Sequence, residues 1–310
     1  MIITAEAMDE VARATIRWPT SRKWNSKDKQ ERFKSLFGAN IDVITEIWNR
    51  IEQNVDAGVV PKHLLYGLVF LKVYGKSEEV HCAIVDWPTA KTFREKSWHI
   101  IECIADLKDS VIKLDNRFIN APPINGHIRG ALLVIDCTDC KINEPYPFCS
   151  KWLSQKFKGP GLKYEVAVAI HSDNICWYFG PFPAHRNESR IFTEGLSQEL
   201  PGTEPVECDS GPEGDERLMD PQAGMTHQDR KQKSNHRAKI ESIFSRMKQF
   251  NVLDTHFHHS YPDEEDMMYK HQICFESVLI ITQLKLQMGG DKLMDSGPYE
   301  VEYDMAGGLL

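Results

Sequence analysis

Three apolar runs of strand type follow one another in the middle of the chain, and their order restricts the possible folds more than any other feature. The runs are ALLVIDC (131–137), YEVAVAIH (164–171) and NICWYFG (174–180). The turn HSDN at 171–174 joins the second run to the third, and such a short connection favours antiparallel neighbours. The sequence therefore predicts a meander of three strands.

Helices and a further strand follow the meander. Residues 188–200 predict a helix, and residues 205–209 predict a short strand. Residues 235–250 predict a second helix with an apolar stripe that includes Ile240, Ile243 and Met247. A last apolar helix is expected at 267–288. This order indicates an α/β domain with a mixed sheet and flanking helices.

The chain before the meander has a helical pattern. We expect four packed helices within 40–108, the first with Ile44, Ile47 and Ile51 on its apolar stripe. The break at 86–89 leaves two interpretations open. One is a plain helical cap, which is the more common use of such helices. The other is a helix-turn-helix whose helix from Thr89 presents Lys91 and its neighbours to DNA.

These patterns divide the chain into four parts. Residues 1–35 are expected to form a weakly structured arm, on which Trp18 and Trp24 are candidate docking points. Residues 36–125 form an all-helical N-terminal region. The α/β domain spans 126–290, and a tail spans 291–310.

The composition is that of a soluble intracellular protein. Hydrophobic residues make up 41% and charged residues 26% of the chain, which are ordinary shares for a globular domain. Eight cysteines without a dense spacing suit a reducing compartment. The N-terminus has no secretory signal, and the most apolar segments are too short or too charged to span a bilayer. We expect a nuclear location in a eukaryote and a cytoplasmic one otherwise.

Three acidic residues stand where they can hold a metal ion. Asp136 ends the first predicted strand, Asp209 ends the fourth, and Glu241 lies at the border of the apolar stripe of the next helix. Carboxylates in this arrangement can hold Mg²⁺ or Mn²⁺, which would activate water for phosphodiester cleavage. Each residue alone has an ordinary alternative: a turn for Asp136 and Asp209, and an ion pair with Arg237 for Glu241.

The segments around these acids make the set specific. VIDCTDCKINEP and the following KWLSQKFKGPGLKYEVAVAI resemble the first-Asp region of the DDE superfamily endonucleases, the PIF/Harbinger-type transposases and their relatives. ECDSGPEG resembles the second-Asp segment, NHRAKIESIFSRMKQF the segment with the glutamate, and KHQICFESVLIITQLKL the closing helix. The resemblance covers roughly residues 35–290.

This resemblance implies an RNase H-like fold for 126–290 and a catalytic, metal-holding triad of Asp136, Asp209 and Glu241. It also implies DNA cleavage by activated water and joining of the new 3′-OH to target DNA. Two residues depart from the family pattern: Pro212 replaces an aromatic residue, and Glu188 replaces an aspartate. A transposase descendant that binds DNA without cutting it is therefore the alternative, and an RNA-cutting or repair nuclease is a third possibility. The expected partner is DNA, with a separate DNA-binding protein and an oligomeric state left open.

The net charge of −8 disfavours DNA binding by the surface as a whole, but basic residues are grouped near these segments. If they converge, they form a phosphate-neutralising track beside the acids. Scattered solvated charge is the alternative for the single lysines. The candidates are Lys151, Lys156, Lys158, Lys163, Arg237, Lys239, Arg246 and Lys248.

Other metal and nucleotide motifs are weaker. Cys137 and Cys140 have CxxC spacing, but strand alternation predicts that they point to opposite faces, which disfavours zinc. His256, His258 and His259 are expected in an exposed loop. The chain has no Gly-rich phosphate loop and no GxSxG motif, so NTPase and serine-hydrolase functions lack support.

Overall fold

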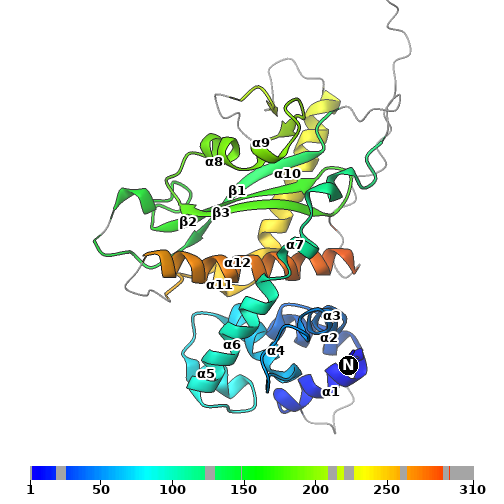
Figure 1. Cartoon of the computed structure of the whole chain (residues 1–310), viewed down its shortest axis with the longest axis vertical. Helices are drawn as coiled ribbons and strands as arrows, with labels where there is room; N and C mark the ends of the chain where they lie inside the picture. The colour runs from blue at the N-terminus through cyan, green and yellow to red at the C-terminus, as the bar shows by residue number, and fades with distance from the viewer. Residues whose placement is uncertain are drawn as a thin grey trace, which may run out of the picture.

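The computed structural model describes residues 2–18, 26–122, 130–147, 149–208, 215–219, 227–258, 264–288 and 293. A group of helices from the N-terminal part of the chain lies at one end of the molecule. A sheet with helices on both sides forms the other end (Figure 1). The chain is therefore a mixed α/β protein with a five-stranded mixed sheet and flanking helices.

The N-terminal helices form a compact group around α4. The helices predicted within 40–108 are confirmed as α3 to α6. Leu64, Leu68 and Leu71 of α4 are all fully buried, as the apolar run predicts. The bounds are α1 (Ala5–Thr15), α2 (Ser26–Phe37), α3 (Ile41–Ile51), α4 (Pro61–Val73), α5 (Glu78–Ile84), α6 (Ala90–Ala105), α7 (Lys108–Val111) and the 3-10 helix η1 (Leu114–Phe118).

The expectation of a weakly structured arm at 1–35 is wrong for the described residues. The helices α1 and α2 bury Met8, Ala12 and Phe33 against the N-terminal core, each with at most 1% of its surface exposed. Trp18 is buried with them, whereas Trp24 lies outside the described residues. Only a few apolar positions of each helix face this core, so the polar majority of the segment concealed the pattern.

The sheet has the strand order β3-β2-β1-β4-β5. The strands β1, β2 and β3 pair antiparallel and confirm the predicted meander, while β4 runs parallel to β1 and β5 runs parallel to β4. The prediction that β1 ends at Asp136 is wrong, because its ladder with β2 continues to the pair Lys141 and Gly161. The bounds are β1 (Leu133–Lys141), β2 (Gly161–Ala169), β3 (Ile175–Pro183), β4 (Val206–Glu207) and β5 (Leu218–Met219).

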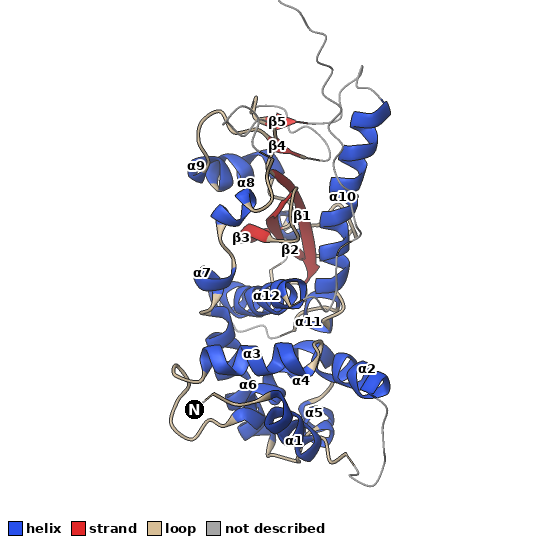
Figure 2. Cartoon of the chain, turned by 90° about the vertical axis from the view of Figure 1, so that its right-hand side faces the viewer, coloured by secondary structure: helices blue, strands red, loops and turns tan. Residues whose placement is uncertain are grey.

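Helices cover both faces of the sheet (Figure 2). The helices α8 (Glu188–Glu194) and α9 (Leu196–Glu199) cover one face, where Leu133 and Ile135 join their core. The other face is covered by α10 (His227–Met247), α11 (Asn251–Asp254) and α12 (Glu264–Gln287), and Val134 joins that core. The alternating residues of β1 therefore serve two separate cores.

Two predicted helix boundaries are wrong. The helix predicted at 188–200 is divided at Gly195, whose φ of −111° and ψ of −105° leave the helical region. A Cβ atom at Gly195 would lie 2.4 Å from Cδ1 of Phe179, so the chain passes too close to β3 for a side chain there. The helix predicted from Asn235 begins earlier, at His227.

The helix α12 lies between the N-terminal helices and the sheet (Figure 2). On one side Ser277 Oγ donates a hydrogen bond to the carbonyl oxygen of Ile101 in α6 at 2.9 Å. On the other side Gln283 Oε1 accepts one from the Ile175 N–H of β3 at 2.7 Å. The two halves of the molecule thus share one helix, which explains why 16 of its 24 residues are buried, among them all of 273–286.

None of the helices in the described part of the chain is long and apolar enough to cross a membrane.

Candidate functional site

Asp136 lies in the middle of β1 on the face covered by α10. Val134 and Cys140 share its row of the strand, because alternate residues point to the same side. Both belong to the core beneath α10 and α12. Asp136 itself is half-buried, and its Oδ1 accepts the N–H of Cys137 at 2.7 Å. A strand in the centre of the sheet therefore presents this carboxylate toward α10.

The strand β4 runs beside β1 and leads to the second predicted acid. Val206 pairs with Leu133, and Glu207 pairs with Val134, in parallel register. The Glu207 side chain points to the α10 face, because its Oε2 lies 2.8 Å from His236 Nδ1. Asp209, two positions after Glu207, lies outside the described residues, as does Pro212. The described strand therefore ends just before the second predicted acid.

The helix α10 packs its apolar stripe on the same face of the sheet. Ile240 and Ile243 are fully buried there. One flank of the helix faces β2, since Lys239 Nζ donates to the carbonyl oxygens of Ala169 and Ile170 at 3.2 Å each. Glu241 is two residues further on, which is about 200° around a helix, so it lies on the other flank. The contact of α10 with β4 is made by His236, whose Nδ1 lies 2.8 Å from Glu207 Oε2.

The Glu241 side chain is exposed and forms an ion pair. Its side chain is 55% exposed, and its Oε1 lies 2.9 Å from Nε of Arg237. This is the ion pair that the sequence offered as the alternative. No group of three or more His, Cys, Asp or Glu residues within the described ranges is placed to hold a metal ion, a search that does not include Asp209.

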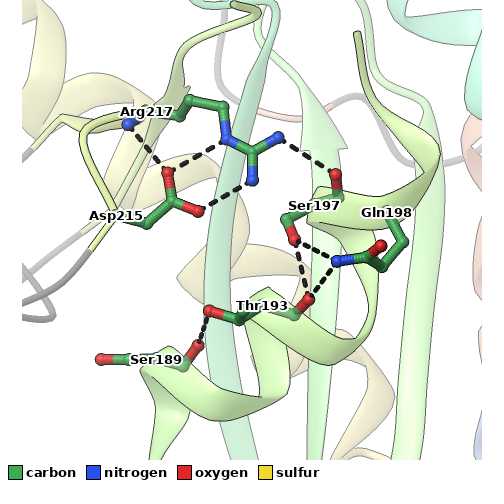
Figure 3. Close-up of polar contacts among 6 residues, drawn as sticks. All are labelled: Ser189, Thr193, Ser197, Gln198, Asp215 and Arg217. Atoms are coloured by element: carbon green, nitrogen blue, oxygen red, sulfur yellow. Dashed lines mark hydrogen bonds and ion pairs between the residues drawn. The ribbon is translucent and has the colours of Figure 1, made fainter. Parts of the chain in front are cut away.

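The chain that resumes after 209–214 is fixed to the sheet and to α9. Arg217 Nη1 donates to the carbonyl oxygen of Ser197 at 3.0 Å, and its Nη2 donates to Asp215 Oδ2 at 2.8 Å (Figure 3). The N–H of Val206 donates to the carbonyl oxygen of Arg217 at 2.9 Å. Residues 215–219 are thus held against β4 and α9.

Two of the eight predicted DNA-contacting residues are buried. Lys163 is 7% exposed, with its Nζ 2.8 Å from Glu188 Oε1. Lys239 is 9% exposed, on the side of α10 that faces β2. Their burial speaks against direct contact with phosphates. The departure at Glu188 gains a structural explanation, because its longer side chain reaches Lys163.

The other six predicted basic residues are at least partly exposed, and several have partners within the protein. Lys151 is paired with Glu264 at 2.7 Å. Lys156 donates to the carbonyl oxygen of Cys137, one residue after Asp136. That contact brings one predicted phosphate-binding residue next to the candidate site. The remaining members are Lys158, Arg237, Arg246 and Lys248.

A buried polar cluster on the opposite face of the sheet escaped the sequence analysis. Asp139 and Lys163 are register partners on β1 and β2, with Asp139 Oδ1 3.7 Å from Lys163 Nζ. Ser154 Oγ donates to Asp139 Oδ2 at 2.5 Å. Glu165, on the same row of β2, is 1% exposed, and burial, with the nearby Glu188 carboxylate second, raises its pKa to about 8. The sequence signal for this cluster is the pair of charged residues Lys163 and Glu165, two positions apart in an otherwise apolar strand.

The cysteines and histidines form no further site in the described residues. Cys137 and Cys140 are both buried and free, and their odd spacing on β1 places them on opposite faces, as predicted. His256 lies in a loop and His258 contacts Tyr74, while His259 is outside the described residues.

Comparison with known proteins adds no identification: no protein-family model, no curated protein and no solved structure matches the chain.

Proposed function

We propose that the chain is a metal-dependent DNA endonuclease of the DDE, transposase-like type. Asp136, Asp209 and Glu241 would hold Mg²⁺ or Mn²⁺ between β1, β4 and α10. The observation that carries the proposal is the packing of these three elements on one face of the sheet. Asp136 points to that face, β4 leads toward Asp209, and α10, which carries Glu241, packs on the same face and contacts β4 through His236.

The topology of the sheet supports an RNase H-like fold. The strands β1, β2 and β3 are antiparallel. β4 then pairs in parallel with the other edge of β1, and β5 pairs in parallel with β4, which gives the order β3-β2-β1-β4-β5. This is the arrangement expected of that fold, with the first acid on the central strand. The support is topological, and a fold alone does not establish an activity.

The proposal places two requirements on the chain. Asp209, two positions after Glu207, must lie beside Asp136, two positions after Val134. Glu241 must also exchange Arg237 for a metal ion. The second requirement is modest, because both side chains of that pair are about half exposed and such surface pairs contribute about 0–1 kcal/mol.

A bound metal ion would supply activated water and stabilisation of the leaving 3′ oxygen. The side chains of the protein would hold the ion and bind the DNA. The carboxylates fix the ion against the rigid centre of the sheet. Lys156, next to the main chain of β1, and Lys248, the residue that directly follows α10, would bind the DNA phosphates.

A DNA-binding descendant without cleavage activity is the second candidate. The Arg237–Glu241 pair favours it, because an arginine already satisfies the third carboxylate. In that case the surface near α10 would bind DNA through the basic side chains, and the acids would have only structural roles.

Nicking of supercoiled plasmid, and of DNA that carries the ends of the transposable element that would encode the chain, tests the proposal. We expect nicking by the wild type with Mn²⁺ or Mg²⁺ and none with EDTA. Asp136→Asn, Asp209→Asn and Glu241→Gln should each reduce the rate by a factor on the order of 100 or more. Glu95→Gln, at an exposed position of α6, is the matched control and should remain active.

Two outcomes would contradict an active nuclease. One is nicking that Asp209→Asn leaves unchanged, which would point to a contaminant. The other is no metal-dependent nicking of either DNA. Retained DNA binding in a gel-shift assay would then identify the non-cleaving descendant, and loss of both would reject the two candidates together.

A further inference from the structure

A cavity opens along the outer edge of the sheet, far in the strand order from the acids described above. Its volume is about 350 Å³, within the range of ligand sites. The strand β3 forms its floor, and β3 is an edge strand. Ile112 and Leu114 form one wall, and Glu199 of α9 and Gln272 of α12 border the rest.

The main chain of Tyr178 faces outward from the sheet at this cavity. The Ile170 N–H donates to Leu132, so residues 166 and 168 direct their main-chain groups toward β1 and residues 165 and 167 direct theirs toward β3. Tyr178 pairs with Val166, and its N–H and C=O therefore turn away from β2. Among the described residues, none makes a hydrogen bond to these two groups. An exposed strand edge of this kind is a template for another extended chain.

The charges around the cavity are acidic on balance. Lys108 Nζ lies 3.5 Å from Oε1 of the buried Glu276, so a neighbouring carboxylate already neutralises its charge. Glu199 is held at the cavity by Trp177, whose Nε1 donates to its Oε1 at 3.0 Å. Within the described structure neither Glu199 nor Asp109 has an ion-pair partner. Two carboxylates beside the aromatic side chains of β3 favour a cationic group and disfavour the phosphates of a nucleic acid.

We propose that this cavity binds an extended peptide segment of a partner protein that carries an arginine or lysine. The segment adds to the edge of β3 and pairs its main chain with the N–H and C=O of Tyr178. Its basic side chain lies between Asp109 and Glu199. This site is independent of the proposed nuclease function, because it lies at the β3 edge and uses none of the three acids.

Selection of random heptapeptides on the full-length chain tests this site. We expect the selected peptides to carry arginine or lysine. Their affinity, measured by fluorescence anisotropy, should fall about tenfold or more for the double variant Asp109→Asn/Glu199→Gln. Glutamine at 199 retains the acceptor for Trp177. The control Glu10→Gln/Asp42→Asn changes the net charge equally at exposed positions of α1 and α3 and should bind as the wild type does.

Main-chain pairing has its own readout. A selected peptide that is N-methylated at successive single amides should lose binding at one of them, and hydrogen exchange of the Tyr178 amide should slow when the unmodified peptide binds. The proposal is overturned if no peptide is selected, if the selected peptides lack basic residues, or if the double variant binds them equally well. It is also overturned if every N-methylated peptide binds unchanged.

Discussion

Glu165 is buried in the centre of the sheet, and its protonation links folding to pH. Its pKa in the folded chain is about 8, whereas an unfolded glutamate has a pKa of about 4.3. The folded chain therefore holds a proton that the unfolded chain releases. The stability that this proton contributes is complete below pH 4 and is lost as the pH rises toward 8.

We expect Glu165→Gln, which imitates the protonated side chain, to remove this dependence. The difference in unfolding free energy between variant and wild type should grow by on the order of 1 kcal/mol per pH unit between pH 5 and 8, in favour of the variant. Urea unfolding at three pH values measures it, with Glu95→Gln as the exposed control. Parallel pH dependences of Glu165→Gln and wild type would show that Glu165 is not protonated in the folded chain.

Lys239 offers a second test, because its burial assigns it to the fold instead of to DNA. Its ammonium donates to main-chain carbonyl oxygens at the end of β2, and burial lowers its pKa. Lys239→Met should leave those acceptors unsatisfied and reduce the free energy of unfolding by about 1–3 kcal/mol. DNA affinity should change little. Lys248→Met, at a more exposed position directly after the same helix, should show the reverse, and equal losses of DNA affinity in both variants would contradict this assignment.

The sequence could not have separated Lys239 from Lys248. Both belong to one basic segment, Lys239 on α10 and Lys248 directly after it, and the carbonyl oxygens that bind Lys239 belong to residues about seventy positions earlier. The same holds for Lys163, whose partner Glu188 comes from a helix that only the folded chain brings over the sheet. Local patterns predict which side chains are charged, whereas tertiary contacts decide which of them remain available to a ligand.

At the scale of elements, the division between α8 and α9 depends on close packing at Gly195. A side chain there would meet Phe179 and Trp177 of β3. We expect Gly195→Ala to reduce the free energy of unfolding by about 1–3 kcal/mol, because both rings are packed and cannot move freely. Gly202→Ala is the control, since its added Cβ would meet nothing within 4 Å. Equal thermal stabilities of the two variants would contradict the packing explanation.

The elements that were predicted correctly carry their information locally. The apolar stripe of α3 and the continuous apolar run of α4 are visible in the sequence, as are the three strands of the meander. The end of β1 and the helix α1 were not predicted. A polar residue such as Asp139 can continue β1 because Ser154 donates to its carboxylate and Lys163 of β2 lies 3.7 Å from it, and both are tertiary contacts. Of the candidate site, the sequence placed Asp136 and Glu241 on the correct elements, and Asp209 stays a prediction.

At the scale of the whole molecule, α12 makes the N-terminal helices and the sheet one folding unit. We expect both halves to unfold together, with the same free energy of opening by hydrogen exchange for peptides from α4 and from β2. Ser277→Leu should overpack the contact with α6 and lower both values by about 1–3 kcal/mol. Gln287→Leu, at the exposed end of the helix, should change neither. Protection that persists in α4 after β2 has opened would show two independent units.

The position of α12 in the chain has a consequence for how a cell makes the protein. The helices α1 to α6 leave the ribosome before residues 106–263 have been synthesised, yet the surface of α6 around Ile101 is completed only by α12. At about 5–20 residues per second, that apolar surface stays uncovered for many seconds. Nascent chains should therefore need chaperone protection until translation is almost finished, and polypeptides truncated before Glu264 should aggregate.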